Sequence, residues 1–265
     1  MTAREALREA ARRLATAGID TAEWEARQVV AHAASARPAE LAAHPEREVP
    51  REELEPLLRR REAREPLAYV LGEWGFRRLT LRTDRRALVP RPETEVVVER
   101  CLALLSGLER PRVLDVGTGT GAIALAIADE HPGARVTGVD TSAEALSLAR
   151  ENAELTGLEV ELREGGVDVA AEGWELVVSN PPYVGAEELA SLEPEVRDWE
   201  PRAALVDTGL HERLAQVART RFLVLEVGAG QAGGFAALLA PLGYSGTRIS
   251  RDLGGVERVV EGERA

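Results

Sequence analysis

Apolar residues recur with a helical period in the first quarter of the chain. Leu7, Ala10 and Leu14 lie three to four positions apart, and Trp24, Val29, Val30 and Ala33 also recur at helical spacing. Prolines at positions 38, 45, 50 and 56 divide the stretch into short pieces. The pattern predicts a small helical bundle over residues 1–72, followed by a hairpin or linker over 73–91, where FRRLTLRT alternates apolar and polar residues.

Over residues 92–265 short apolar runs alternate with helical patterns. The expected strands are RVLDVG, ARVTGVD, LEVELRE, WELVVSN, RFLVLEVG, GYSGTRIS and VERVVEG, most of them separated by a helical segment. Repeated strand–helix units predict an α/β domain with a mostly parallel sheet and helices on both faces. Right-handed crossovers then bring the carboxyl ends of the parallel strands to one edge, where ligands bind.

Composition narrows the function classes. A formal net charge of −12 argues against a protein that captures nucleic acid through phosphate neutralisation. The one cysteine, Cys101, lies in an apolar helical pattern and is expected in the core, and the four histidines, expected at the surface or at helix ends, lack metal-ligand spacing, so no metal site is predicted. Without a signal-peptide core in MTAREALREAARRL or a membrane-length apolar run, a cytoplasmic protein is expected.

A glycine-rich turn joins the first expected strand of this domain to a helix in LDVGTGTGAIALA, residues 114–126. Glycines at 117, 119 and 121 let the backbone approach a ligand closely. Asp140 closes the next strand, about 20 residues further on, where an acid accepts hydrogen bonds from ribose hydroxyls. The turn is compatible with NAD or with S-adenosyl-L-methionine (SAM), and the glycines alone do not distinguish them.

The stretch VVSNPPYV, residues 177–184, ends another expected strand at the same sheet edge. The side-chain carbonyl of Asn180 and the backbone carbonyl of Pro181 are acceptors, and Pro181 and Pro182 add no competing N–H donors. Tyr183 adds a flat ring. Two acceptors and a ring suit a planar group that ends in NH2, whose nitrogen would be aligned with an electrophilic methyl group. The alternative is a strand end that is merely stiffened by prolines.

These motifs resemble those of known methyltransferases. Asn-Pro-Pro-Tyr on a SAM-binding sheet is similar to the amino-methyltransferases, which include adenine-N6 and glutamine-N5 enzymes. The stretches PLAYVLGEWGF, LVPRPETE and RDLGGVERVV resemble one branch, the bacterial release-factor glutamine methyltransferases of the HemK/PrmC-like type. The resemblance covers nearly the whole chain.

The resemblance implies a class I, Rossmann-like SAM-dependent methyltransferase with a seven-stranded sheet, an antiparallel final strand and a helical recognition domain. The implied reaction transfers a methyl group to N5 of the glutamine in the Gly-Gly-Gln loop of peptide-chain release factors 1 and 2. It implies a monomer with no stable nucleic-acid partner and no membrane partner. Implied SAM-binding residues are Gly117, Thr118, Gly119, Thr120, Gly121, Asp140, Gly165 and Asn180; Asn180, Pro181 and Tyr183 would be catalytic, and Asn180 to Tyr183 with Arg91 and Glu93 would bind substrate.

Other interpretations stay open at this point. The acceptor could be a ribosomal-protein glutamine or an adenine N6 in nucleic acid, and an NAD-dependent oxidoreductase or a non-catalytic scaffold would keep the fold. Adenine recognition is expected near Glu164 and Gly165, with Asp168 as the alternative, because REGGVDV departs from the family pattern. The segment LHERLAQVART is also shorter than in the family. Glu226 is a candidate neighbour of the pocket without an assigned role.

Overall fold

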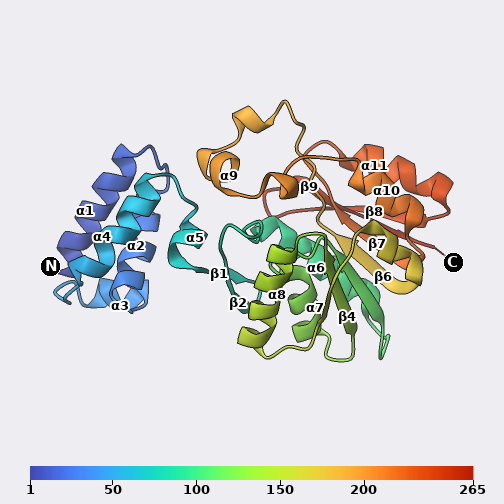
Figure 1. Cartoon of the computed structure of the whole chain (residues 1–265), viewed down its shortest axis with the longest axis horizontal. Helices are drawn as coiled ribbons and strands as arrows, with labels where there is room; N and C mark the ends of the chain where they lie inside the picture. Colours follow the sequence, from blue (N-terminus) through green and yellow to red (C-terminus); the bar gives the residue numbers. More distant parts are fainter. Residues whose placement is uncertain (265) are drawn as a thin grey trace. The chain divides into compact units, whose positions relative to one another are not determined.

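The computed structural model describes residues 1–264, which form two compact units (Figure 1). The first unit comprises residues 1–72 together with 193–199, and the second comprises residues 73–192 and 200–264. No helix among the described residues is long and apolar enough to cross a membrane.

The first unit is helical. Its helices are α1 (Ala3–Thr16), α2 (Ala22–Ala33), α3 (Pro38–Ala43), α4 (Arg51–Glu62), α5 (Leu67–Leu71) and α9 (Pro194–Trp199). Helix α1 begins with a capping box, in which Thr2 Oγ1 accepts from the Glu5 backbone and Glu5 Oε2 accepts from the Thr2 backbone. Leu14, Val29 and Val30 are buried as the pattern predicts, whereas Trp24 is 48% exposed.

Helix α9 belongs to this unit although it lies more than 120 residues after α5 in the chain. The ion pairs of Glu195 explain the placement. Glu195 Oε1 lies 2.7 Å from Arg61 Nη2 and 2.7 Å from Arg64 Nε. Arg61 also binds Glu25, and both of these side chains are buried. Because a buried charge is costly without a partner, Arg61 needs both carboxylates.

The second unit opens with an antiparallel hairpin of β1 (Glu73–Phe76) and β2 (Leu79–Arg82). A seven-stranded sheet follows in the order β5-β4-β3-β6-β7-β9-β8. Strand β9 is antiparallel to both neighbours, and the other described pairings are parallel. The strands are β3 (Arg112–Val116), β4 (Arg135–Asp140), β5 (Glu161–Glu164), β6 (Trp174–Ser179), β7 (Thr220–Glu226), β8 (Ser245–Arg251) and β9 (Glu257–Glu263). The predicted fold class is confirmed.

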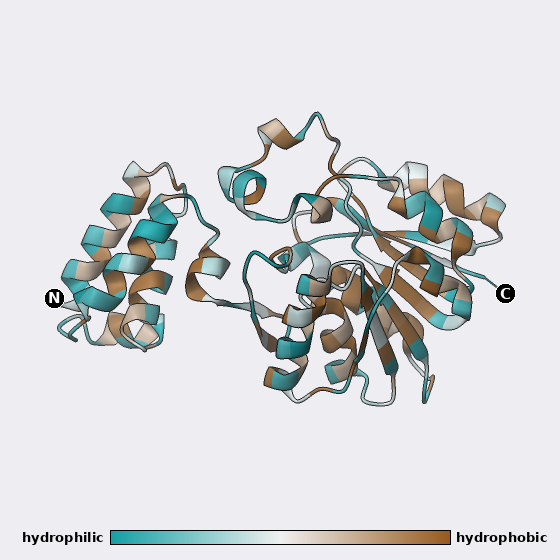
Figure 2. Ribbon diagram, viewed as in Figure 1, coloured by the Kyte–Doolittle hydropathy of each residue, from teal (hydrophilic) through white to brown (hydrophobic). Residues whose placement is uncertain are grey.

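Helices cover both faces of the sheet, and the apolar strands between them form the core (Figure 2). One layer contains α6 (Glu95–Leu105) and α7 (Ala122–Glu130), which pack on Val113, Val178 and Val224. The other contains α10 (Leu210–Val217) and α11 (Ala232–Leu239), which pack on the alternate residues Leu114, Val177 and Leu223. Helix α8 (Ala143–Thr156) contacts β2, β4 and β5.

The burial of Cys101 and His211 can be compared with the positions predicted for them from the sequence. Cys101 is fully buried in the core, as predicted, and burial raises the pKa of its thiol well above the usual value. His211 lies in the first turn of α10 but is also fully buried, so a surface position is wrong for it. Its ring stacks on Phe235 at 4.3 Å between centroids, and its Nε2 lies 2.8 Å from the Glu226 carbonyl oxygen.

Candidate active site

The glycine loop links β3 to α7 at the carboxyl edge of the sheet. Gly117, Gly119 and Gly121 have φ angles of +74°, +55° and +83°, a region that favours glycine. The backbone N–H groups of Gly117 and Thr118 donate to the Val139 carbonyl at 2.8 and 2.9 Å, so the loop is fastened to the end of β4. A Cβ at Gly117 would meet no atom within 4 Å, so this side of the loop can accept a ligand.

Asp140 ends β4 and is joined to the glycine loop by hydrogen bonds. Its Oδ2 accepts from the Gly119 backbone at 3.0 Å, and its Oδ1 accepts from the Ser142 backbone at 2.9 Å. A carboxylate has about four acceptor positions, so both oxygens keep capacity for further donors. The geometry brings together the glycines and the acid that the sequence singled out.

Asp115 is a site residue that the sequence analysis left without a role, although it opens the motif. Its side chain is fully buried, and its Oδ2 accepts from Thr118 Oγ1 at 2.6 Å. Its Oδ1 has no partner within residues 1–264. Burial raises the pKa of Asp115 to about 7; the hydrogen bond from Thr118 and the backbone N–H of Ala124 oppose this shift, and the negative charge of Asp140 adds to it. An unpaired buried carboxylate oxygen beside an open glycine loop fits a cationic amino group, which SAM carries.

The segment after β5 lies beside the end of β4. The Gly165 N–H donates to the Asp140 carbonyl at 3.0 Å, and a Cβ at Gly165 would come within 2.8 Å of Val169 Cγ2. Glu164 pairs with Asp140 in the strand register, whereas Asp168 lies in the short helix Val167–Glu172. Contact of these residues with adenine stays a prediction. Thr120 is buried in the glycine loop, where its carbonyl accepts from Asn152 Nδ2 at 2.9 Å.

Asn180 follows β6, next to the end of β3. The preceding Ser179 donates from Oγ to the Val116 carbonyl at 2.6 Å, which fixes the strand end. Asn180 Nδ2 donates to Thr94 Oγ1 at 3.2 Å, and Thr94 Oγ1 donates to Glu226 Oε2 at 2.7 Å. Within residues 1–264 the structure gives Asn180 Oδ1 no hydrogen-bond partner. The amide group is therefore held through its nitrogen, and its oxygen is available as an acceptor.

Tyr183 is held from the segment after β7. Its carbonyl accepts from Gln231 Nε2 at 3.2 Å, and Gln231 Oε1 accepts from the Gly228 backbone at 2.9 Å. A Cβ at Gly228 would lie 3.1 Å from Tyr183 Cδ2, so the glycine allows this close approach. Burial, reinforced by the negative charge of Glu226, raises the pKa of Tyr183, which stays protonated. Pro181 is buried, and Pro182 is partly exposed.

Arg91 precedes the short helix Pro92–Thr94, and Glu93 lies within it. Arg91 Nη2 lies 2.7 and 2.8 Å from the two carboxylate oxygens of Glu200. Burial raises the pKa of Glu200, and the Arg91 charge opposes this shift. Arg91 is thus already committed to an ion pair. The negative charge of Glu93 contributes to the raised pKa values of both Glu226 and Tyr183.

Gln231 was not singled out from the sequence, whereas Glu226 was a candidate neighbour of the pocket without an assigned role. Thr94 lies inside PRPETE, the stretch that carried the resemblance. Glu226 ends β7, and β7 is the parallel neighbour of β6, which ends just before Asn180. The rule that adjacent parallel strands end at one edge explains why Glu226 lies near Asn180.

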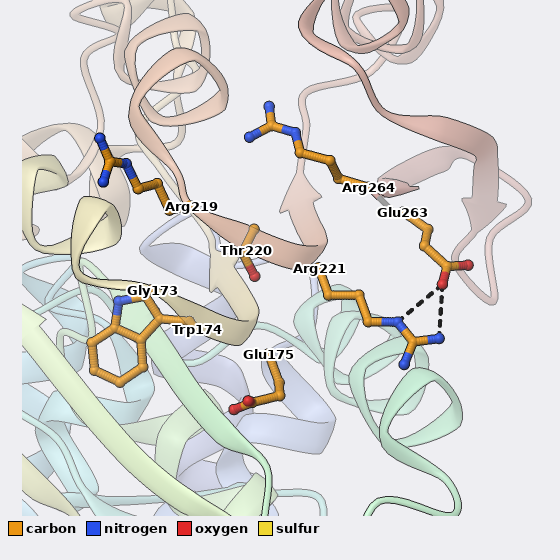
Figure 3. A pocket seen from close by; sticks show the side chains of 8 residues that line it. All are labelled: Gly173, Trp174, Glu175, Arg219, Thr220, Arg221, Glu263 and Arg264. Carbon is orange, nitrogen blue, oxygen red and sulfur yellow. Dashed lines mark hydrogen bonds and ion pairs between the residues drawn. The ribbon is translucent and has the colours of Figure 1, made fainter.

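A surface hollow of about 790 Å³ lies at the opposite edge of the sheet (Figure 3). Trp174 and Thr220 line it at the beginnings of β6 and β7, and Arg221 pairs there with Glu263 at 2.9 Å. Ligands of open α/β sheets bind at the carboxyl ends of the strands, so this hollow is separate from the candidate site.

Known proteins match both units. Residues 5–72 match the family described as the PrmC N-terminal domain, and residues 96–192 match the methyltransferase small domain. The release factor glutamine methyltransferase of Deinococcus radiodurans is 42% identical over 100% of this chain and 99% of its own length. That of Cereibacter sphaeroides is 40% identical over 98% of each. The chain belongs to the release factor glutamine methyltransferase family.

Solved structures of lower identity share the methyltransferase fold. The catalytic domain of hMettl16, in complex with an RNA hairpin, has a TM-score of 0.56 at 13% identity and covers 70% of this chain and 75% of its own. The Thermus thermophilus rRNA methyltransferase RsmC, in complex with AdoMet and guanosine, has a TM-score of 0.54 at 18% identity and covers 73% and 50%. At such identities these two likenesses describe the fold of the family and not its substrate.

Proposed function

We propose that the protein transfers a methyl group from SAM to N5 of the glutamine in the Gly-Gly-Gln loop of peptide-chain release factors. The observation that carries this proposal is the Asn180 side chain, held through its nitrogen with its oxygen available at the ligand edge of the sheet. Family membership supports the choice of a glutamine amide over other NH2 groups.

SAM would be held by residues of the glycine loop and the neighbouring strand ends. The open side of Gly117 allows close approach, and the unpaired Asp115 Oδ1 would accept from the cofactor's amino group. Asp140 would accept from the ribose, Gly165 would border the adenine, and Thr118, Gly119, Thr120 and Gly121 would complete the loop. When bound, SAM supplies a methyl group that is already electrophilic on its sulfonium.

The chain's own residues would hold and align the acceptor amide. Asn180 Oδ1 and the Pro181 carbonyl would accept its two N–H hydrogens, while Tyr183 packs on the amide plane and Pro182 stiffens the loop. Such alignment turns the nitrogen lone pair toward the methyl carbon. The N–C bond forms as the C–S bond breaks, and the nitrogen then releases one proton. Because the nitrogen becomes acidic only after transfer, no strong base is required beforehand.

Neighbouring segments would contribute to substrate binding. Glu93 would line the pocket, and Arg91 would shape it from its ion pair with Glu200. The helical unit, residues 1–72, would recognise the release factor, with residues 73–91 as the joining segment. Release factors 1 and 2 are the proposed substrates of a monomeric, cytoplasmic enzyme.

An acceptor panel tests this function. The purified protein and methyl-labelled SAM are offered an unmethylated release factor, a release factor whose Gly-Gly-Gln glutamine is replaced, unmethylated ribosomal protein and adenine-containing DNA. Transfer to the first acceptor alone supports the proposal. Equal transfer to the replaced release factor, or preferential transfer to ribosomal protein or DNA, would overturn it.

A further inference from the structure

Asn180, Thr94 and Glu226 form a hydrogen-bonded chain from three distant segments of the sequence. Thr94 ends the short helix before α6, Asn180 follows β6, and Glu226 ends β7. The Nδ2 to Oγ1 distance is 3.2 Å, and the Oγ1 to Oε2 distance is 2.7 Å. Thr94 is 5% exposed and Glu226 is 1% exposed, so water has little access to these two side chains.

The direction of these hydrogen bonds depends on Glu226. A threonine hydroxyl has one hydrogen. When Glu226 is ionised, that hydrogen is donated to the carboxylate, so Thr94 Oγ1 can only accept from Asn180. When Glu226 is protonated, it can donate to Thr94, whose own hydrogen is then available to the Asn180 carbonyl. The Asn180 amide would turn over in that state and present NH2, rather than oxygen, to a substrate amide.

We propose that Glu226 is a positioning residue whose carboxylate, acting through Thr94, keeps Asn180 Oδ1 directed at the acceptor amide. This inference rests on the proposed function, because it assigns the held oxygen to the glutamine N–H. Hydrogen bonds in such a chain also polarise one another, so a carboxylate at one end strengthens the acceptor at the other.

The surroundings of Glu226 bring its titration close to neutrality. Burial raises the pKa of Glu226 to about 7, against the Thr94 hydrogen bond and the positive charges of Arg258 and Arg91, while Glu93 raises it further. Tyr183 faces it as a neutral group, because its own pKa is raised. Burial lowers the pKa of His211, which contacts the Glu226 backbone. The hydrogen bonding of the Asn180 amide should therefore change as the pH falls through about 7.

The first test is the pH profile of turnover on release factor at saturating SAM, which removes any effect of pH on cofactor affinity. Wild-type turnover should fall about fivefold from about pH 8 to about pH 6, as the carboxylate protonates and a state with roughly one-tenth of the rate takes over. At the higher pH, Glu226→Gln and Thr94→Val should each turn over roughly tenfold more slowly than the wild type. Both variants should also lack the fall in turnover toward low pH, which we call the acid limb. Thr94→Ser keeps the hydroxyl and should keep both rate and limb.

The second test uses the cofactor-free protein and needs no activity. The side-chain amide resonance of Asn180, assigned by its loss in Asn180→Ala, is followed by 15N NMR between about pH 6 and pH 8, the range that brackets the Glu226 transition. It should shift through a transition near pH 7 in the wild type and stay constant in Glu226→Gln and Thr94→Val. This readout separates the inference from the proposed function, because it holds even if release factor is not the acceptor.

Glu261→Gln is the matched control. Glu261 is another buried glutamate of the same sheet, on β9, and it pairs with Arg100 at 2.7 Å rather than with the Asn180 chain. It should keep the wild-type acid limb and the Asn180 transition. The inference is wrong if Glu226→Gln or Thr94→Val keeps the wild-type rate, or if it is slower but retains the acid limb and the NMR transition. Valine has nearly the same shape as threonine, so Thr94→Val can test the inference even if Glu226→Gln misfolds.

Discussion

The two loops at the carboxyl edge of the sheet are held in different ways. The glycine loop after β3 is fastened by backbone hydrogen bonds to Val139 and by Asp140, which lies about 20 residues away in the chain. The Asn180 loop after β6 is fastened by side chains from further away: Thr94, Glu226 and Gln231. A loop that binds the same cofactor in every turnover can be built locally, whereas a loop that orients an incoming amide is supported by two other segments, one with Thr94 and one with Glu226 and Gln231.

Among these variants, Asn180→Ala should have the largest effect, and it should act through the Asn180 loop. Turnover should fall about 100-fold or more, because a hydrogen bond that aligns the reacting nitrogen is lost. SAM affinity should change little, since Asp115, Asp140 and the glycines remain. Single-turnover rates test the expected fall in turnover, and calorimetric SAM binding on the same preparation tests the expected SAM affinity. Near-wild-type turnover would refute the role of Asn180.

Asp140→Ala should act on the first loop instead. SAM affinity should fall about tenfold, because the ribose partner is lost and the Gly119 and Ser142 backbone groups lose their acceptor. Turnover at saturating SAM should change less. Asp129→Ala is a control, because Asp129 pairs with Arg78 at 3.5 Å at the end of α7. Unchanged SAM binding in Asp140→Ala would contradict the ribose assignment.

The affinity for SAM should depend on pH through Asp115. Its pKa is raised to about 7 in the free protein, and a bound cationic amino group would lower that pKa. Binding is then favoured when Asp115 is ionised, so affinity should weaken roughly threefold from about pH 7.5 to about pH 6.5. Calorimetry across this range measures it. Asp115→Asn should bind more weakly and without that slope, and a wild-type affinity that rises on acidification would contradict the assignment.

Gln231→Ala should have the smallest effect. It removes the side-chain bridge between the Tyr183 carbonyl and the Gly228 N–H, so the Asn180 loop should loosen and turnover fall about twofold. SAM affinity should stay at the wild-type value. A loss of SAM affinity without a loss of turnover would mean that Gln231 supports the glycine loop and not the Asn180 loop.

The sequence predicted the parts of the site that local motifs define. Strand ends, a glycine turn and an acid at the next strand end follow from short-range patterns, so Gly117, Asp140 and Asn180 were found at one edge. The supporting contacts join residues far apart in the chain, such as Thr94 with Glu226 across 132 positions. The spacing of apolar and polar residues along the sequence does not predict a contact between residues so far apart.

The same limit applies to the fold. The hydrophobic pattern predicted the helices of residues 1–72, the seven strands and most of the helices between them, because apolar runs and their spacing are local features of the sequence. It did not place α9 in the first unit, because that placement depends on the ion pairs of Glu195 with Arg61 and Arg64. The ion pair of Arg91 with Glu200 could not be predicted for the same reason, since the two residues are 109 positions apart in the sequence.

The most direct test of the account is peptide mass spectrometry of an unmethylated release factor after incubation with the wild-type protein and isotopically labelled SAM. We expect one labelled methyl group on the side-chain nitrogen of the Gly-Gly-Gln glutamine, and a strongly reduced amount with Asn180→Ala. A methyl group on another residue, or full labelling of that glutamine by Asn180→Ala, would contradict it.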